Sequence, residues 1–489
     1  MSWSRLDTAA LVLVTAAAAV LRLTGLDRPA GLVFDEIFYA RDACWYIFAS
    51  ESPCGIADLA SRAHPPLGKW LIASGIAVFG YAETEPFSYR ITAAIAGIVT
   101  VVLLYLLAWR LLRTVAPGRV ATVGAFAAAG LLAVDFLHLV QSRVGMLDVF
   151  IVMFVVLAIL AIVLDRDRLR PTQRPTLIDR VTFGHPWRLV AGAALGAATA
   201  TKWSGGYVAL ALIGLTVVWE IARARREQPG TAWSASVRRA VRREAVPTIV
   251  LLGLVPLAIY IASYTGRMPG ALLALPWQEG SVWRGIWEHQ RAMLDWHTSL
   301  GGHHPYESPA WSWGALKRPV AYFFTNEPGA YREILALGSP VAWWPGFAAV
   351  LLSGVLWVRW RADVWGPEIV IVAAALATYG PWLVLGGSRS QTFIWYMLPT
   401  MPFVFLALGL VVARLWLGWL GRAAAVGFAA VVLAAFLFFY PVLVALPLAP
   451  DAWWQRIWFR DCDRPDGPAL SLPDDEINQG QPPDGWCWI

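Results

Sequence analysis

The 489-residue chain has little charge and very little lysine. Asp, Glu, Lys and Arg make up 15% of its residues, whereas 58% are hydrophobic. Soluble domains contain about 25% charged residues, so this composition excludes an ordinary soluble protein. We also expect no cleavable signal peptide, because the first apolar stretch runs into Arg28 and Pro29 without a small-residue cleavage pattern. We expect that stretch to remain as a membrane anchor.

Long apolar stretches dominate the rest of the sequence. About 20 apolar residues in helical form cross a bilayer, and about eleven stretches approach that length. The fifth of them is short, which is typical of a tilted or broken helix. The sequence therefore predicts an all-α integral membrane protein. The expected spans lie near residues 9–26, 91–109, 120–140, 146–164, 188–201, 204–221, 246–264, 341–358, 368–385, 393–413 and 423–445.

Basic residues are concentrated in alternate loops. Arginine is dense in 165–187 and 223–245, whereas the long loops 27–90 and 265–340 and the tail 446–489 have fewer basic residues, mixed with acidic ones. Loops rich in Lys and Arg stay in the cytoplasm. We therefore expect a plasma-membrane protein with a cytoplasmic N-terminus and an extracytoplasmic C-terminus. The net charge of +6 then reflects topology and lipid headgroups, not nucleic-acid binding.

The chain contains only four cysteines, Cys44, Cys54, Cys462 and Cys487. All four lie on the outer side in this topology, where disulfides persist. Four cysteines allow three pairings, and the sequence does not choose among them. The pairs that are local in sequence, Cys44–Cys54 and Cys462–Cys487, are our working expectation, with unpaired thiols as the alternative.

The sequence offers no separate soluble domain, internal repeat or low-complexity tract. We expect one membrane domain over 1–450 and an extracytoplasmic tail over 451–489. In the first outer loop, the segment GKWLIASGIAVFGY is too short to span a bilayer and predicts an amphipathic or re-entrant helix. Most tryptophans of the second outer loop, 265–340, are expected at the membrane interface, which favours indole.

An acidic pair, Asp35–Glu36, follows the first apolar span by nine residues. The topology places the pair in the water layer outside the bilayer, flanked by Phe34, Phe38 and Tyr39. A partly desolvated carboxylate there can take a proton from a hydroxyl, and its neighbour can orient the acceptor or change the pKa. An isolated acidic pair is more often a solvated surface feature. The aromatic flanks and the motifs that follow favour a site.

The segment RAHPPLGKW at 62–70 contains His64 and Lys69, one of only three lysines in the chain. Because proline restricts itself and the residue before it, His-Pro-Pro predicts an extended turn that presents both side chains to one site. Arg90, at the outer mouth of the second span, is suited to hold a phosphate. The structural alternatives are a snorkelling lysine and an arginine that anchors its helix at the headgroups.

Other ionisable residues, Arg143, Asp148 and Lys202, lie at the outer ends of predicted spans. Such residues are functional candidates in a membrane protein, although salt bridges between helices explain them equally well. The histidines of the large outer loop lack the spacing of a zinc site, so no metal is predicted. That loop also supplies five polar candidates, Gln290, His297, His303, His304 and Tyr306.

Taken in order, these pieces resemble the protein O-mannosyltransferase family, in the bacterial branch found in actinobacteria. HPPLGK with an upstream Asp-Glu pair is specific, whereas the other pieces are weak singly. The eleven-span layout also matches, so the resemblance covers nearly the whole chain. The matching pieces are Asp35–Glu36, HPPLGKW at 64–70, Arg143 with Leu147-Asp148, Thr201-Lys202-Trp203-Ser204-Gly205 and HHPYESPAWSW at 303–313.

The resemblance implies a glycosyltransferase of the GT-C type, with about 11 transmembrane helices and outer loops that carry amphipathic helices. Such enzymes transfer mannose from polyprenyl-phosphate-mannose to Ser or Thr hydroxyls of exported proteins, with inversion. Because the phosphate is already a good leaving group once cations compensate its charge, we expect no required metal or cofactor. Asp35 would then be the general base, with Glu36 supporting acceptor placement. The leaving phosphate would be bound by Arg90, Lys202 and one of His64 and Lys69. The other candidates are expected at the substrate site: Arg143, Asp148, Gln290, His303, His304 and Tyr306.

The resemblance also sets the expected partners, which are membrane lipids, the lipid-linked donor, exported polypeptides and the protein export channel. The eukaryotic relatives insert a soluble module into the large outer loop, which here spans only 265–340. Two other functions stay open. One is a glycosyltransferase of the same fold that acts on a cell-wall or lipid glycan. The other is a transporter of lipid-linked sugars, which would have mid-span ionisable residues and pseudo-repeats, and neither is visible.

Overall fold

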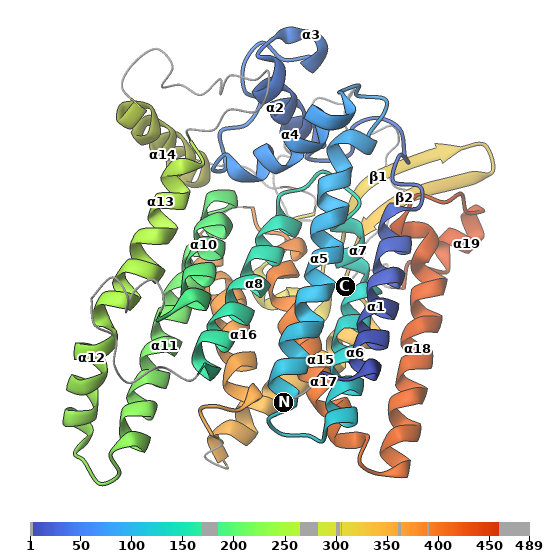
Figure 1. The fold of residues 1–489 in the computed structure, drawn as a ribbon. Coiled ribbons are helices and arrows are strands. Elements are labelled where there is room, and N and C mark those ends of the chain that lie inside the picture. The colour runs from blue at the N-terminus through green and yellow to red at the C-terminus, as the bar shows by residue number, and fades with distance from the viewer. Residues whose placement is uncertain are drawn as a thin grey trace.

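The computed structural model describes residues 3–168, 184–264, 282–299, 304, 306–359, 363–388 and 391–458. Long, roughly parallel helices form a bundle, and short helices and a hairpin form a cap at one end of it (Figure 1). The bundle helices are α1 (Arg5–Leu23), α5 (Phe87–Leu112), α6 (Gly118–Ala133), α8 (Asp148–Asp167), α10 (Pro186–Thr201), α11 (Gly205–Glu227), α12 (Trp233–Ile249), α13 (Val255–Ala262), α15 (Pro340–Arg359), α16 (Pro367–Leu385), α17 (Met401–Leu415) and α18 (Trp419–Leu443). The π-helical turn η1 (Val250–Leu254) joins α12 to α13.

Apart from α14, the remaining elements are short. The helices are α2 (Glu36–Phe48), α3 (Glu51–Cys54), α4 (Leu67–Phe79), α7 (Phe136–Gln141), α14 (Val282–Ser299) and α19 (Pro450–Trp454), with the 3-10 turns η3 (Ala310–Ala315), η4 (Gly386–Ser388) and η5 (Ile394–Thr400). The strands are β1 (Val320–Glu327) and β2 (Ala330–Ala336).

The cap gathers parts of the chain that are far apart in sequence. It contains α2, α3 and α4 of the first long loop, α14 and the β1–β2 hairpin of the second, and α19 near the end of the described chain (Figure 1). The described parts of the loops 27–90 and 265–340 therefore lie at the same end of the molecule, as predicted. The turn between α11 and α12, which belongs to an arginine-rich segment, lies at the opposite end.

Nine helices of the described chain are long and apolar enough to cross a membrane. The α12–η1–α13 helix counts as one of them, and η5 with α17 as another. The predicted spans 120–140 and 188–201 correspond to α6 and α10, which have 16 residues each. The first of these stops early because Asp135 caps the separate short helix α7, accepting from the His138 N–H. The chain is a multi-span membrane protein, but a count of eleven spans is not established.

The β1–β2 hairpin is the departure from an all-helical architecture within the described residues. The strands pair antiparallel, from Val320 opposite Ala336 to Glu327 opposite Ala330. A bridge from Tyr331 to Leu448 joins the hairpin to the chain that follows α18. A search for apolar windows of membrane-spanning length misses such strands, because they are about half as long as one span.

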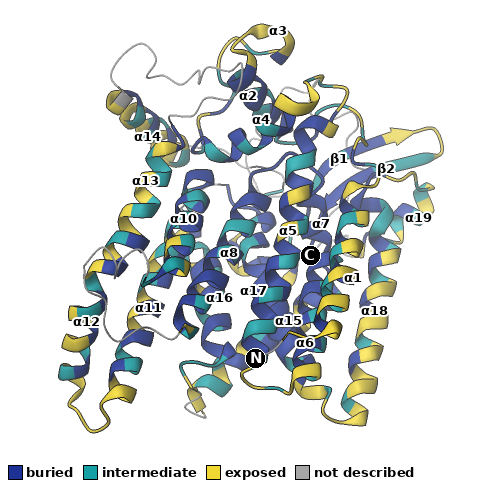
Figure 2. Ribbon diagram, in the orientation of Figure 1, coloured by how far each residue is buried: buried dark blue, intermediate teal, exposed yellow. Residues whose placement is uncertain are grey.

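The interior of the bundle is tightly packed. Helices α8 and α17 are almost entirely buried, whereas α18 exposes most of its length on the outside (Figure 2). Helices α6 and α17 cross closely at Gly124 and Gly409. A Cβ added to Gly409 would lie 2.6 Å from the carbonyl oxygen of Gly124, which is closer than real Cβ atoms approach. Both positions therefore require glycine for this crossing.

One of the two local disulfides is present. Cys44 of α2 and Cys54 of α3 are bonded, with their Cα atoms 5.5 Å apart, which confirms this expected pair. The bond ties the short helix α3 to α2 within the cap. Cys462 and Cys487 lie outside the described residues, together with most of the predicted tail.

A methyl group at position 409 should force α6 and α17 apart. We expect Gly409→Ala to lower the unfolding free energy by about 1–3 kcal/mol, the usual cost of overpacking a core, measured as thermal melting in detergent. Gly427→Ala is the matched control, because it makes the same change on α18, where no atom lies within 4 Å of the added Cβ. Equal melting temperatures for the two variants would contradict this packing argument.

Candidate active site

Asp35 stands at the start of α2, within the cap. Its main-chain carbonyl accepts hydrogen bonds from the N–H groups of Phe38 and Tyr39, each at 3.0 Å. Its side chain is half-buried and makes no capping bond to the helix. The carboxylate therefore does not cap α2, which leaves it available to another partner.

Glu36, the next residue, is fully buried and is used inside the protein. Its two carboxylate oxygens pair with Arg90, with Nε–Oε1 at 2.7 Å and Nη2–Oε2 at 2.8 Å. The N–H groups of Val33 and Gly145 donate to the same carboxylate, at 2.8 and 2.7 Å. Because both oxygens are engaged away from solvent, Glu36 holds structure here, and the predicted contact with an acceptor does not fit this geometry.

Arg90 was expected to hold a phosphate, but its donors are used within the protein. Besides Glu36, it donates to the carbonyl oxygens of Leu26, Pro29 and Gly31, at 3.4, 2.9 and 3.1 Å. It is fully buried. Arg90 thus fastens the chain after α1 to the start of α5, and it does not line the cavity described below.

Arg143 has a similar structural task at the end of α1. Its guanidinium donates to the carbonyl oxygens of Leu21, Arg22, Thr24 and Gly25, at distances of 2.8–3.2 Å. These are carbonyls that a helix terminus leaves without internal partners. Arg143 therefore caps α1 and does not reach the cavity.

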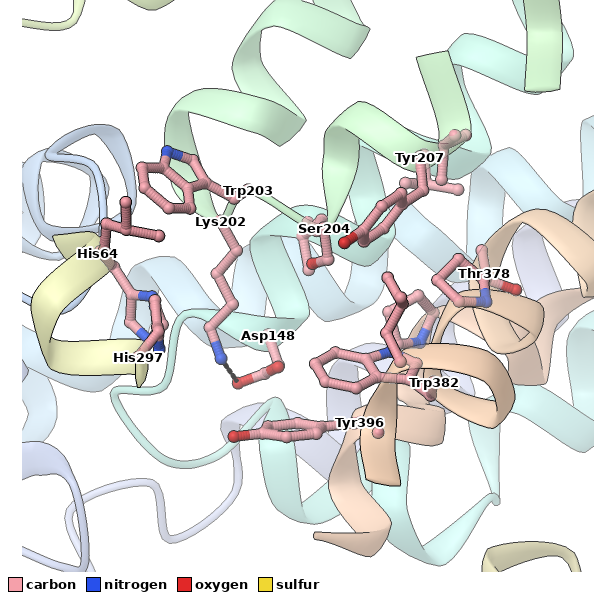
Figure 3. A pocket seen from close by; sticks show the side chains of 18 of the residues that line it. His64, Asp148, Lys202, Trp203, Ser204, Tyr207, His297, Thr378, Trp382 and Tyr396 are labelled. Carbon is pink, nitrogen blue, oxygen red and sulfur yellow. Dashed lines mark hydrogen bonds and ion pairs between the residues drawn. The ribbon is translucent and has the colours of Figure 1, made fainter. Parts of the chain in front are cut away.

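A cavity of about 380 Å³ lies below the cap, between α8, α11, α14 and α16 (Figure 3). Its polar lining includes Asp148 and Lys202, and its other walls carry aromatic and aliphatic side chains. Most small-molecule sites have this mixture and a volume of this order. The lining residues are His64, Asp148, Ile151, Val155, Lys202, Trp203, Ser204, Tyr207, Val208, Leu294, His297, Thr298, Thr378, Pro381, Trp382, Leu385, Gly386, Tyr396 and Pro399.

Asp148 and Lys202 form an ion pair in this cavity, with Lys202 Nζ 2.7 Å from the Asp148 carboxylate. The ammonium also lies 5.7 Å from the centre of the Tyr396 ring. Figure 3 shows the pair pointing into the space between Trp203 and Tyr396. An ammonium has three N–H donors, so Lys202 can bind Asp148 and an anionic ligand together. Of the predicted cations, Lys202 is the one best placed for a phosphate.

The motif at 64–70 reaches this region because Gly68 allows a close approach. A Cβ at Gly68 would lie 2.8 Å from Leu147 Cδ2 and 3.0 Å from Thr201 Cγ2. Those residues immediately precede Asp148 and Lys202, so α4 packs directly on the chain that carries the ion pair. His64, just before α4, consequently lines the cavity.

Lys69 does not face the cavity. It is buried and pairs with Asp42, with Nζ 2.6 Å from the carboxylate, and it also donates to the carbonyl oxygen of Ser61. Asp42 in turn accepts from the N–H groups of Ala60 and Ser61. Lys69 therefore joins α4 to α2 and to the loop between them, which is a structural role in place of the predicted phosphate contact.

Asp35 lies close enough to the cavity for the charges of Lys202 and Asp148 to shift its pKa. Burial and the negative charge of Asp148 raise the pKa of Asp35 to about 6, although Lys202 and a hydrogen bond from Tyr39 oppose that rise. The ring of Tyr39 lies 6.1 Å from that of His64, which lines the cavity. A carboxylate with a pKa near 6 is ionised at neutral pH and is a stronger base than an ordinary one.

The remaining described candidates do not line the cavity. Gln290 of α14 bonds to the hydroxyls of Tyr260 and Tyr264, at 2.6 and 2.8 Å, and thereby fixes α14 to α13. His304 and Tyr306 are neighbours, since the Tyr306 N–H donates to His304 Nδ1 at 3.1 Å. None of these three lines the cavity. His303 lies outside the described residues.

Several site residues were not predicted from the sequence. Tyr39 carried a usable signal, because it follows Asp35 by four residues, one helical turn. Trp203 is adjacent to a predicted residue, whereas Trp382 and Tyr396 line the cavity from elements distant in sequence. No local pattern distinguishes these aromatic residues from the many others in the chain. His297, a sequence candidate from the large outer loop, also lines the cavity.

Two family models match consecutive parts of the chain. One, described as "Dolichyl-phosphate-mannose-protein mannosyltransferase", matches residues 12–267, and the other, "C-terminal four TMM region of protein-O-mannosyltransferase", matches residues 282–462. The polyprenol-phosphate-mannose--protein mannosyltransferase of Mycolicibacterium smegmatis is 31% identical over 497 aligned residues, which cover 91% of each chain. The chain belongs to the protein O-mannosyltransferase family.

Other relatives and solved structures agree with this assignment. The enzyme of the same description from Mycobacterium tuberculosis is 29% identical, with 92% of this chain and 90% of that one covered. The Saccharomyces cerevisiae Pmt1–Pmt2 complex bound to the sugar donor matches with a TM-score of 0.73 at 16% identity, covering 95% and 94% of the chains. ArnT from Cupriavidus metallidurans matches with a TM-score of 0.54 at 19% identity, covering 89% and 65%. The chain is thus a mannosyltransferase with the predicted GT-C fold.

Breaking the Glu36–Arg90 pair should harm the fold of this mannosyltransferase. Glu36→Gln keeps the shape but leaves the Arg90 charge unpaired, and removal of one partner of a buried ion pair costs about 3–5 kcal/mol. We expect a marked fall in thermal stability in detergent. Asp35→Asn is the matched control, the same acid-to-amide change one residue earlier, and it should melt like the wild type. A Glu36→Gln protein as stable as Asp35→Asn would contradict the structural role of the pair.

Proposed function

We propose that the enzyme transfers mannose from polyprenyl-phosphate-mannose to Ser and Thr hydroxyls of exported polypeptides, with Asp35 as the general base. The observation that carries this proposal is the position of Asp35 beside a cavity that holds the Asp148–Lys202 pair. The relatives named polyprenol-phosphate-mannose--protein mannosyltransferase support the donor and the acceptor class.

The cavity suits a lipid-linked sugar phosphate. Lys202 supplies a positive charge for the phosphate, and the aromatic rings of Trp382 and Tyr396 offer faces for a sugar. Ile151 and Val155 of α8 line the cavity on the bundle side, where the prenyl chain can continue among apolar helices. A donor held in this way keeps its chain in the bilayer and its sugar below the cap.

Proton removal accompanies attack in the proposed reaction. A Ser or Thr hydroxyl oxygen forms a bond to the anomeric carbon while the bond from that carbon to the phosphate oxygen breaks, and the hydroxyl proton passes to the Asp35 carboxylate. A single displacement of this kind inverts the anomeric centre. The phosphate leaves with the bonding electrons, and its charge is compensated by Lys202. We therefore propose that the step needs no metal ion.

The distribution of arginine supports one orientation in the membrane. We propose that the arginine-rich turn between α11 and α12 lies in the cytoplasm of a cell-membrane protein, and that the cap and the cavity face outward. The acceptor would then meet the enzyme as it leaves the cell, next to the export channel. Lipids would surround the exposed faces of helices such as α18.

The central test is mannose transfer from purified polyprenyl-phosphate-mannose to a Ser/Thr-rich peptide by the purified enzyme, in the presence of a chelator. We expect wild-type transfer to continue in chelator and Asp35→Asn to lower the rate roughly 100-fold or more, the usual loss when a general base is removed. Transfer to a glycan with none to peptide would refute the proposed acceptor. A fully active Asp35→Asn enzyme would refute the proposed base.

The pH dependence of transfer provides a second, independent test. A general base must be ionised to act, and the pKa of Asp35 is raised to about 6. The rate should therefore be constant above about pH 7 and fall roughly tenfold per pH unit below pH 6. It is measured by single-turnover transfer between pH 4.5 and 8. An acid limb near pH 4, the value of an ordinary Asp, would show that the site does not perturb its base.

A further inference from the structure

The backbone immediately before the proposed base has an unusual conformation. Phe34 has a φ of +52°, in the left-handed region that bulky side chains seldom adopt. Such residues cluster at functional sites, where the surrounding structure must hold them. Because Phe34 and Asp35 share a peptide bond, the direction of the Asp35 carboxylate depends on this conformation.

The ring of Phe34 is held from two sides. It stacks on Tyr322, with centroids 4.3 Å apart and planes 7° from parallel, and it meets Trp395 edge-on at 5.3 Å. Trp395 is itself stacked on Phe393 at 4.2 Å. These contacts come from β1 and from the chain around η5, both more than 280 positions away from Phe34 in sequence. Segments distant in sequence therefore hold Phe34 in a left-handed backbone conformation that phenylalanine disfavours.

Tyr322 is fixed in turn from the bundle. It is buried in β1, with 1% of its surface exposed, and its hydroxyl accepts a hydrogen bond from Gln141 Nε2 of α7 at 2.6 Å. Its position is close to the reacting region, since the charges of both Asp148 and Asp35 act on its hydroxyl. Phe34, Tyr322 and Gln141 thus form a continuous connection from the bundle to the proposed base.

We propose that Tyr322, through its stack on Phe34 and its bond to Gln141, is a positioning residue that holds the Asp35 carboxylate toward the cavity and shields it from water. This inference rests on Asp35 acting as the base. It gives the β1–β2 hairpin a function, which is to bring Tyr322 under the N-terminus of α2. Tyr322 and Phe34 need no contact with substrate for this role.

The alternative is that these rings only fill the core. Core packing alone predicts that substitutions lower the amount of folded protein and leave the turnover of each folded molecule unchanged. A positioning role predicts a change in the reaction itself. Small displacements of a catalytic group can cost about 100-fold in rate, so kcat should fall while the KM for the donor, set by the cavity, stays within about twofold.

The test uses three variants and two controls, with kcat, donor KM and the acid limb of the pH profile measured per folded enzyme. We expect Tyr322→Leu to lower kcat about 10- to 100-fold and to move the acid limb to lower pH, because water reaches Asp35. Tyr322→Phe keeps the ring but loses the hydrogen bond from Gln141, and should lower kcat several-fold. Phe34→Gly supplies the left-handed backbone without strain but removes the ring, so kcat should fall although the fold is retained.

Phe324→Leu is the matched control on the same strand. Phe324 is buried and packs on Tyr331 and Trp453, at 5.4 and 5.6 Å, so its loss should destabilise the hairpin without changing kcat or the pH profile. If Tyr322→Leu does not fold, Tyr322→Phe and Phe34→Gly decide the question.

The inference is overturned if the Tyr322 and Phe34 variants have the wild-type kcat. It is also overturned if Phe324→Leu changes kcat and the acid limb as the Tyr322 variants do. Asp35→Asn, measured beside them, separates the two proposals. Activity in that variant would reject the base itself, whereas an inactive Asp35→Asn with normal Tyr322 variants would reject only the positioning role.

Discussion

The buried ion pair between Glu36 and Arg90 is the constraint on which the geometry of the site depends. Successive residues at a helix start point in directions about 100° apart, as follows from 3.6 residues per turn. Once Glu36 is drawn into the protein by Arg90 and by the N–H groups of Val33 and Gly145, Asp35 must point elsewhere. Two adjacent carboxylates of similar chemistry thereby acquire different tasks: Glu36 forms a structural ion pair, and Asp35 lies within electrostatic reach of the Asp148–Lys202 pair.

The same pair connects the parts of the chain that build the cavity. Arg90 also binds main-chain carbonyls that follow α1, and Gly145 belongs to the turn that leads into Asp148. A position of Asp35 relative to the Asp148–Lys202 pair is therefore set through buried hydrogen bonds. Burying two charges costs solvation free energy, and the complete hydrogen bonding of this pair offsets that cost. The intact pair therefore fixes the relative positions of these segments, although it adds little net stability over apolar residues of the same size.

The sequence predicted the general scheme of this site but not its detailed partners. The acidic pair, the ion-pair residues Asp148 and Lys202, and His64 were identifiable as candidates from residue type, spacing and topology, and the Cys44–Cys54 bond was a working expectation that the structure confirms. Arg90 and Lys69 were assigned to a phosphate because a cation near an outer loop looks the same in sequence whether it meets a ligand or a buried carboxylate. Only the three-dimensional structure shows that Arg90 pairs with Glu36 and that Lys69 pairs with Asp42. The hairpin and Tyr322 were missed for a related reason, since a short strand inside a long loop has no membrane-length pattern and its stacking partner is 288 positions away.

The Asp148–Lys202 pair shows how one carboxylate can serve two purposes in a site of low polarity. Asp148 holds the Lys202 ammonium in place before any donor arrives, and a lysine retains N–H donors for a phosphate while it keeps that bond. The negative charge of Asp148 also acts on Asp35 and raises its pKa. Burial makes Asp35 a stronger base and the like charge of Asp148 adds to that effect, while Lys202 and the Tyr39 hydroxyl oppose the rise in pKa. Loss of Asp148 would therefore lower the pKa of Asp35, and loss of Lys202 or of the Tyr39 hydroxyl would raise it.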